Sequence, residues 1–218
     1  MASLREKMLA VISDMCRDNL VLGTWGNVSV RDGDNSMLIT PSGMNYEQLE
    51  PADLVRLSLD GGTAQGRWKP SSEWRLHAAI YRGRQDISAI VHTHSVYATA
   101  FAVARMPIPA VVEDLVQVAG GSVDVADYTL PGTDELAENA LLALGNKSAV
   151  LLASHGLVGA AQTLEEALKV CRIAEKTAQV ALFARLLGPV HELSEEDIRA
   201  MRNFYLTSYG PEYRGEDK

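Results

Sequence analysis

The stretch AIVHTHS at residues 89–95 joins a short apolar run to two histidines two positions apart. The apolar run predicts a buried strand over residues 88–93. Because side chains alternate between the two faces of a strand, His92 and His94 are expected to point the same way. Two imidazoles side by side on a rigid strand make half of a metal site, so the remaining ligands must come from elsewhere in the chain.

The composition is that of a globular protein. With 218 residues, of which 47% are hydrophobic and 22% charged, the chain can bury the core of one domain, residues 1–218. The net charge of −8 argues against nucleic acid as the main partner, because phosphate backbones require Lys and Arg surfaces. No uncharged run suits a membrane span, no segment reads as a signal peptide, and Cys16 and Cys171 lack a metal or disulfide spacing. These features predict a cytoplasmic protein.

Helical and strand patterns are interleaved along the chain. Amphipathic spacing and capping residues predict helices at residues 3–21, 73–83, 95–104, 111–119, 133–144, 163–187 and 194–206. Short apolar runs between turns predict strands at residues 27–30, 37–40, 54–59, 88–93, 123–126, 149–152 and 157–160. Several strands are linked as hairpins, so a layered α/β/α domain with a mixed sheet is expected rather than a purely parallel one. Residues 207–218 are expected to form a mobile polar tail.

Two further side chains complete a candidate metal site with the histidine pair. His155 lies between an apolar strand and Gly156, where a side chain can project into a pocket. Glu73 begins a helix and could bind a metal or act as a base, although a carboxylate at a helix start is also favourable to the helix dipole on its own. Catalytic sites for divalent cations typically combine histidine and carboxylate ligands in this way. His77, four residues after Glu73, is expected to pack or to support a ligand, and His191 to lie on the surface.

Three turns rich in small residues could bind an anion through backbone N–H groups and hydroxyls. They lie at residues 23–27, 40–43 and 71–72. Turns use Gly, Ser and Asn in any case, so each turn is a weak signal by itself. No glycine-rich nucleotide-binding motif occurs in the sequence, so nucleotide binding is not indicated.

Together these motifs resemble the class II aldolase/adducin family, most closely its fuculose-1-phosphate aldolase branch. The matching pieces are GTWGNVS (23–29), ITPSG (39–43), PSSEWRLH (70–77), VHTH (91–94), AGG (119–121) and HGL (155–157). The resemblance covers essentially the whole chain, roughly residues 5–210. The combination is much more specific than any one piece.

The resemblance implies a three-layer α/β/α sandwich with a nine-stranded mixed sheet, and a homotetramer with active sites at subunit interfaces. It implies one zinc ion per subunit, held by Glu73, His92, His94 and His155, with the glutamate also serving as base. Such a ligand set also accepts Mn²⁺ or Co²⁺. The positions that match phosphate-binding residues of the family are Thr24, Gly26, Asn27, Ser42, Gly43, Ser71 and Ser72.

One departure from the family pattern concerns the second acid. The fuculose-phosphate branch carries a tyrosine in the loop after Ile-Pro-Ala, supplied across the interface to protonate the leaving oxygen. Here residues 108–110 are followed by Val-Val-Glu-Asp, so Glu113 is the candidate for that role. By resemblance, Tyr209 in the tail is the other group expected to reach the active site. Fucose-like specificity therefore does not follow.

The implied activity is reversible aldol cleavage of a ketose 1-phosphate, a small-molecule sugar phosphate, to dihydroxyacetone phosphate and an aldehyde. The metal would act as a Lewis acid at the carbonyl, and Glu73 would take or return the proton. Within the family, aldolases of 5-deoxy- or methylthio-pentulose phosphates, a pentulose-phosphate 4-epimerase, a sugar-acid phosphate decarboxylase and a methylthioribulose-phosphate dehydratase remain open. A Schiff-base aldolase would need a buried lysine, whereas Lys69 and Lys147 lie in predicted turns. An adducin-like scaffold is the non-enzyme alternative.

Overall fold

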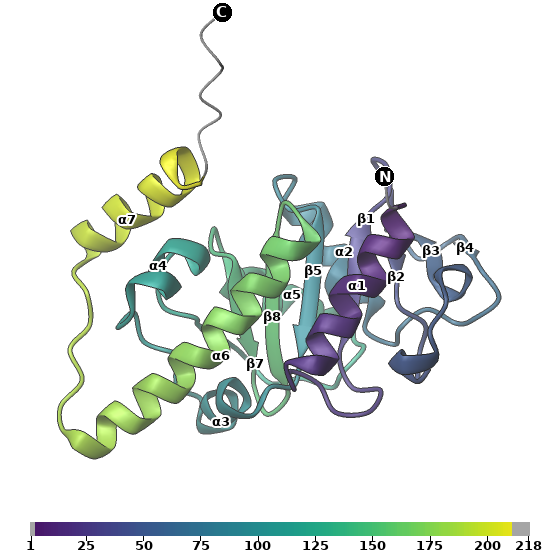
Figure 1. Cartoon of the computed structure of the whole chain (residues 1–218). Coiled ribbons are helices and arrows are strands. Elements are labelled where there is room, and N and C mark those ends of the chain that lie inside the picture. Colours follow the sequence, from purple (N-terminus) through teal and green to yellow (C-terminus); the bar gives the residue numbers. More distant parts are fainter. Residues whose placement is uncertain (1–2, 211–218) are drawn as a thin grey trace, which may run out of the picture.

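The computed structural model describes residues 3–210 (Figure 1). The helices are α1 (Leu4–Arg17), α2 (Trp74–Gly83), α3 (Val96–Ala104), α4 (Glu113–Ala119), α5 (Asp134–Leu144), α6 (Leu164–Leu187) and α7 (Glu195–Ser208), with 3₁₀ helices at Tyr46–Gln48 and Pro51–Asp53. The strands are β1 (Asn27–Arg31), β2 (Ser36–Ile39), β3 (Val55–Ser58), β4 (Ala64–Gln65), β5 (Ala89–Thr93), β6 (Val125–Ala126), β7 (Ala149–Leu152) and β8 (Gly156–Ala161). None of these helices is long and apolar enough to cross a membrane.

The described residues form one mixed sheet with the strand order β4-β3-β2-β1-β5-β8-β7-β6. Neighbouring strands are antiparallel except β6 and β7, which are parallel. Strand β5, which contains the first histidine of the pair, lies in the middle between β1 and β8 and sets Asn27 and Val158 opposite His92. The sheet has eight strands within residues 3–210, where nine were expected.

Helices cover both faces of the sheet, which confirms the expected α/β/α arrangement. Helices α1, α3, α4 and α6 pack on one face, and α2 and α5 pack on the other (Figure 1). Alternate residues of β5 enter the two cores: Val91 packs on the side of α6, and Ile90 packs on the side of α2. Because His92 lies two positions after Ile90, its side chain faces the layer of α2 and α5.

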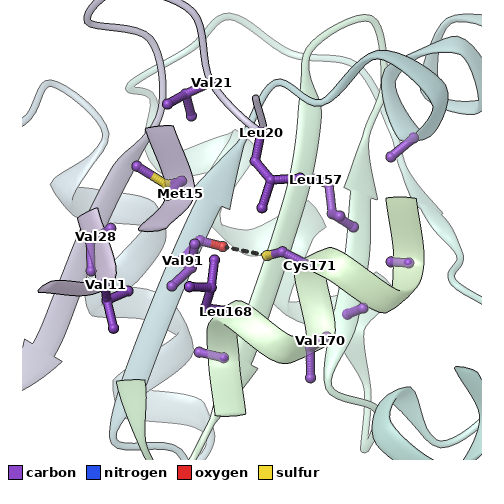
Figure 2. Packing of buried hydrophobic residues seen from close by; sticks show 14 of the residues in the cluster. Val11, Met15, Leu20, Val21, Val28, Val91, Leu157, Leu168, Val170 and Cys171 are labelled. Carbon is purple, nitrogen blue, oxygen red and sulfur yellow. Dashed lines mark hydrogen bonds between the residues drawn. The ribbon is translucent and has the colours of Figure 1, made fainter. Parts of the chain in front are cut away.

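Helix α6 and strand β5 also share a buried hydrogen bond in the core on the α6 side of the sheet. Figure 2 shows the Sγ atom of Cys171 donating to the carbonyl oxygen of Val91, a distance of 3.4 Å. Burial raises the pKa of the Cys171 thiol to about 12, so the side chain is a neutral, small apolar group. The contact fixes the longest helix against β5 one residue before His92.

The structure differs from the predicted elements at three places. Helix α1 ends at Arg17 rather than near residue 21, because Asn19 has a left-handed backbone with φ of 55° that a helix cannot continue. Strand β4 and the two 3₁₀ helices are too short to show a periodic pattern. Helix α7 continues through Ser208, so residues 207 and 208 are helical, and the predicted tail from residue 211 onward lies outside the described residues.

Candidate metal and substrate site

Three imidazoles meet at one end of the central strands. His92 lies in β5, and His94 follows just after the strand ends at Thr93. The Nε2 atoms of the two histidines are 3.0 Å apart, and Nε2 of His155 lies 3.3 Å from Nε2 of His92. The two histidines therefore point the same way, as their spacing predicts, although only His92 lies within the strand.

His155 reaches the histidine pair from the tight connection between β7 and β8. Ser154 has a left-handed backbone in this turn, with φ of 55°. Gly156 follows, and a Cβ atom there would lie 2.3 Å from the carbonyl oxygen of Thr93. Only glycine permits so close an approach, so the His-Gly dipeptide brings the imidazole directly to the end of β5.

Glu73 adds a carboxylate to the three imidazoles. It is the N-cap residue of α2, but its side chain makes no capping hydrogen bond with the helix. Its Oε2 atom lies 3.3 Å from Nε2 of His92, and its Oε1 atom lies 3.3 Å from Nε2 of His155. A helix-start role alone does not explain where this carboxylate points.

Burial keeps two of these imidazoles neutral. Desolvation, followed by the proximity of His155 and His94, lowers the pKa of His92 well below its ordinary value. Desolvation and His155 lower the pKa of His94 to about 4. Since the neutral ring of His92 donates from Nδ1 to the carbonyl oxygen of Leu157, at 3.0 Å, its single proton lies on that nitrogen. The Nε2 lone pair of His92 therefore faces the other three side chains.

The four side chains fit a divalent cation. Four atoms held about 2.0 Å from one centre in a tetrahedron, as around zinc in proteins, lie about 3.3 Å apart. The contacts of 3.0 and 3.3 Å among the nitrogen and oxygen atoms of the cluster match this spacing. The Oε1 atom of Glu73 is buried without a hydrogen-bond partner, a position that a cation would satisfy.

A cavity of about 730 Å³ opens beside the cluster. Glu73, His94 and His155 line the cavity, whereas His92 lies fully buried behind them. The residues predicted to bind phosphate line the same cavity: Thr24, Gly26, Asn27, Ser42, Gly43, Ser71 and Ser72. The structure thus brings both predicted groups of residues to one place, and their roles stay predictions.

The turn before β1 is pressed against β5. Gly26 has a φ of 95°, and a Cβ atom there would lie 2.7 Å from the carbonyl oxygen of His92. Glycine therefore lets this turn run directly beside the cluster. Asn27 comes next and donates from Nδ2 to Oε2 of Glu73 at 2.8 Å. Asn27, which is predicted to bind phosphate, therefore also forms a hydrogen bond with the Glu73 carboxylate.

Glu113 and Tyr209 lie away from the cluster in the described chain. Glu113 is the exposed first residue of α4, and Tyr209 is the exposed C-cap residue of α7. Both line a separate hollow of about 330 Å³, together with Lys169 and Tyr205. Neither of them lines the 730 Å³ cavity. Within one chain, the two predicted acid/base groups do not meet the predicted metal ligands.

The sequence interpretation missed an apolar side of the cavity. Its lining includes Leu22, Trp25, Tyr128 and Pro131. The Trp25 side chain is 67% exposed, and its ring centroid lies 6.0 Å from that of His94. The available signal was a large aromatic residue between two glycines, since a surface turn offers such a side chain no core to enter.

The fold and the site together define a class of protein. A mixed-sheet α/β/α chain that gathers three imidazoles and a carboxylate beside an open cavity is built to hold a divalent metal next to a small molecule. The family model for the Class II Aldolase and Adducin N-terminal domain matches residues 6–182. The chain belongs to this family, which confirms the resemblance of its motifs.

Relatives across the family carry sugar-phosphate aldolase names. The L-fuculose phosphate aldolase of Escherichia coli O6:H1 is 41% identical over 211 residues, which cover 94% of this chain and 97% of that protein. The 5-deoxy-D-ribulose 1-phosphate aldolase of Bacillus thuringiensis serovar kurstaki is 38% identical over 195 residues, covering 89% and 91%. Among solved structures, an L-fuculose 1-phosphate aldolase matches with a TM-score of 0.90 at 36% identity, over 94% of this chain and 98% of that one.

Proposed function

We propose that this chain is an aldehyde-lyase that reversibly cleaves a ketose 1-phosphate to dihydroxyacetone phosphate and an aldehyde, with a bound metal. One observation carries the proposal: the cluster of three histidines and Glu73 borders the same cavity as the seven expected phosphate-binding residues. Aldol cleavage needs both groups together, because the carbonyl and the phosphate belong to one small molecule. The fuculose-phosphate aldolases among the relatives support this reaction class.

Glu73, His92, His94 and His155 would hold the cation, with zinc as the proposed ion and Mn²⁺ or Co²⁺ as alternatives. When bound, the ion supplies Lewis acidity toward the substrate carbonyl. Glu73 presents a buried carboxylate oxygen without a hydrogen-bond partner at the cavity. We assign it the proton transfer at the carbon that becomes nucleophilic.

The turns of small residues would hold the phosphate. Thr24, Ser42, Ser71 and Ser72 each contribute a hydroxyl-bearing side chain to the cavity lining. No lysine or arginine of residues 3–210 lines this cavity, so oriented dipoles and the cation would balance the charge of the phosphate. The chain's net charge of −8 is therefore no obstacle to binding an anion.

We propose a homotetramer with active sites at subunit interfaces, because within residues 3–210 neither of the two predicted acid/base groups lines the cavity beside the cluster. Glu113 and Tyr209 line a different hollow of the same chain. A neighbouring subunit would bring one of them to the leaving oxygen. Glu113 is the first choice, because its carboxyl group stands where the fuculose-phosphate branch has a tyrosine.

A second candidate is an aldolase for a 5-deoxy- or methylthio-pentulose phosphate. The observation that favours it is the apolar side of the cavity, formed by Leu22, Trp25, Tyr128 and Pro131. The aldehydes cut from these two substrates carry no hydroxyl group, whereas the aldehyde cut from fuculose 1-phosphate keeps one beside its methyl group. Apolar walls favour the aldehydes without a hydroxyl, because a buried hydroxyl without a partner is costly. The 5-deoxyribulose-phosphate aldolase relatives support this choice.

The lysine-dependent alternative receives no support from the described residues. Lys147 donates from Nζ to Ser122 and to the carboxylate of Asp124, and Lys69 is exposed. Neither lysine lines the cavity beside the cluster. A Schiff-base lysine would need a desolvated site next to the substrate carbonyl.

The proposal is tested with a panel of ketose 1-phosphates, followed by the release of dihydroxyacetone phosphate and aldehyde. The panel contains fuculose, 5-deoxyribulose and methylthioribulose 1-phosphates, a sugar-acid phosphate and ribulose 5-phosphate. We expect equimolar dihydroxyacetone phosphate and aldehyde from at least one ketose 1-phosphate. Carbon dioxide, an epimer or a dehydrated product would instead identify the decarboxylase, epimerase or dehydratase, and no product from any member would favour the adducin-like scaffold.

We also propose that residues 1–218 work as one domain in the cytoplasm. The family match spans residues 6–182, and the described sheet draws strands from both halves of the chain. Both cysteines, Cys16 and Cys171, are free, which suits a reducing compartment.

A further inference from the structure

A continuous line of buried polar groups runs from Glu73 and Asn27 at the cavity wall into the layer between α2 and β1. Helix α2 and its N-cap residue contribute Glu73, His77 and Tyr81 at a spacing of four residues, and β1 contributes Asn27 and Ser29 at a spacing of two. Spacings of four in a helix and two in a strand each keep side chains on one face. The two faces meet, so the five side chains interleave between helix and strand.

The hydrogen bonds run from one end of this line to the other. They join Tyr81 Oη to Ser29 Oγ at 2.8 Å, Ser29 Oγ to His77 Nδ1 at 2.6 Å, His77 Nε2 to Asn27 Oδ1 at 2.5 Å, and Asn27 Nδ2 to Glu73 Oε2 at 2.8 Å. All five side chains are buried. We call them the Tyr81–Glu73 chain.

The chemistry of the groups fixes the direction of every bond in the Tyr81–Glu73 chain. A carboxylate only accepts, so Asn27 must face Glu73 with Nδ2 and His77 with Oδ1. The amide oxygen also only accepts, so the Nε2 atom of His77 carries a proton. Burial lowers the pKa of His77 to about 3, which leaves the ring neutral with no proton on Nδ1. Ser29 therefore donates to Nδ1 of His77 and accepts from the hydroxyl of Tyr81.

We propose that His77 is a positioning residue for the reaction, which acts through Asn27 to hold the Glu73 carboxylate in the geometry for proton transfer. The inference rests on the proposed function, which makes Glu73 the base. Four hydrogen bonds aligned head to tail strengthen one another in a buried environment. If the His77 ring took the other tautomer, its Nε2 lone pair would face the Asn27 oxygen, and the amide would no longer be held toward Glu73.

The kinetic test follows deuterium exchange from D₂O into dihydroxyacetone phosphate by ¹H NMR, together with zinc content and the KM for dihydroxyacetone phosphate. His77→Phe removes the donor to Asn27, so exchange should slow roughly 10- to 100-fold, with zinc and KM nearly unchanged. His77→Gln keeps an N–H for Asn27 and should recover most of the rate. Tyr81→Phe removes only the outermost hydroxyl and should slow exchange about 2- to 5-fold.

Thr177→Val is the matched control, because the Thr177 hydroxyl on α6 is equally buried but has no hydrogen-bond partner. Its exchange rate should equal that of the wild type. A His77→Phe protein that exchanges at the wild-type rate overturns the inference, and so do His77→Phe and His77→Gln proteins that are equally slow while retaining zinc. If neither variant folds, an unchanged rate in Tyr81→Phe overturns it.

A spectroscopic measurement separates this inference from the proposed function. In histidine-selectively ¹⁵N-labelled wild-type protein, the ring of His77 should carry its proton on Nε2 and none on Nδ1. The opposite tautomer, or a doubly protonated ring at pH 7, overturns the inference. Wild-type protein that shows this tautomer but exchanges no deuterium would refute the proposed function and leave the hydrogen-bond directions standing.

Discussion

The cluster around Glu73 and the hollow that contains Glu113 and Tyr209 are built in opposite ways. In the cluster Glu73 and His92 are buried and His94 and His155 are half-buried, and its members come from three separate segments that the central strands and α2 hold in place. Glu113 and Tyr209 are exposed residues at the start of one helix and just after the end of another. All four side chains of the cluster meet within a single chain. Glu113 or Tyr209 could contact a substrate at the cluster only if a neighbouring subunit supplied it.

This difference separates two parts of the proposed reaction. The proposed metal ligands are placed by strand β5, by the start of helix α2 and by the tight turn between β7 and β8, and such elements hold side chains at fixed distances. The proposed acid for the aldehyde, Glu113, is an exposed residue at which the sequence differs from the family pattern. We therefore expect changes in the cluster to abolish the reaction, and changes at the exposed positions to alter its rate or its preference.

The largest effect is expected from His155→Ala. The substitution removes one of the four proposed metal ligands, so kcat/KM should fall roughly 1,000-fold or more, because the loss of metal-ion stabilisation is worth several kcal/mol. Zinc content by elemental analysis should fall in parallel. The matched control is His191→Ala, an exposed histidine outside the cavity. Full activity and full zinc content in His155→Ala would show that the cluster is not a metal site.

A smaller effect is expected from Glu113→Gln. If the carboxyl group protonates the leaving oxygen, kcat should fall roughly 100-fold while zinc content stays the same, since general acids contribute about 100- to 10,000-fold. Asp114→Asn is the control, because the neighbouring carboxylate pairs with Lys176 on α6 instead. Unchanged turnover in Glu113→Gln would remove this residue from the mechanism and leave Tyr209 as the candidate.

A change in preference is expected from Trp25→Ala. The variant loses apolar surface beside His94, so kcat/KM for 5-deoxyribulose 1-phosphate should fall about 10-fold relative to fuculose 1-phosphate. Leu187→Ala, an exposed apolar residue at the end of α6, serves as the control. An equal loss for both substrates would show that Trp25 supports the site but does not select the aldehyde.

The smallest effect concerns stability rather than turnover. The pKa of His77 is lowered by burial to about 3, against about 6.5 in an unfolded chain. Between these pH values only the unfolded chain binds this proton, so the free energy of unfolding falls as the pH falls, by about 1.4 kcal/mol per pH unit for this group. Urea unfolding of the chelated protein between pH 6 and pH 4 should therefore show a shallower decline for His77→Gln than for the wild type. Parallel declines would mean that His77 is protonated in the folded state.

Much of the fold could be predicted because its decisive segments carry local signals. The apolar run before His92 specifies a central strand, and the interleaved helices and hairpins specify a layered, mixed sheet. Glu73 and His155 are distant in sequence, but a helix start and a His-Gly turn mark each of them separately. Strand β4, with two residues, has no pattern to detect.

The remaining features depend on how segments meet in space. The bond from Asn27 to Glu73 requires the register of β1 on β5 and the packing of α2 on the same face. The spacing of His77 and Tyr81 from Glu73 was visible in the sequence, but their partners on β1 were not. Glu113 lies away from the cluster because of where α4 packs. The sequence predicts this helix but carries no local motif that predicts its position.

The most direct test of the account is turnover of the best ketose 1-phosphate before and after chelation, with zinc then titrated back. We predict that EDTA reduces the release of dihydroxyacetone phosphate to background. Activity should then return in proportion to added zinc until each chain holds one ion. Turnover that survives chelation, together with covalent trapping of substrate on a lysine by borohydride, would contradict the account.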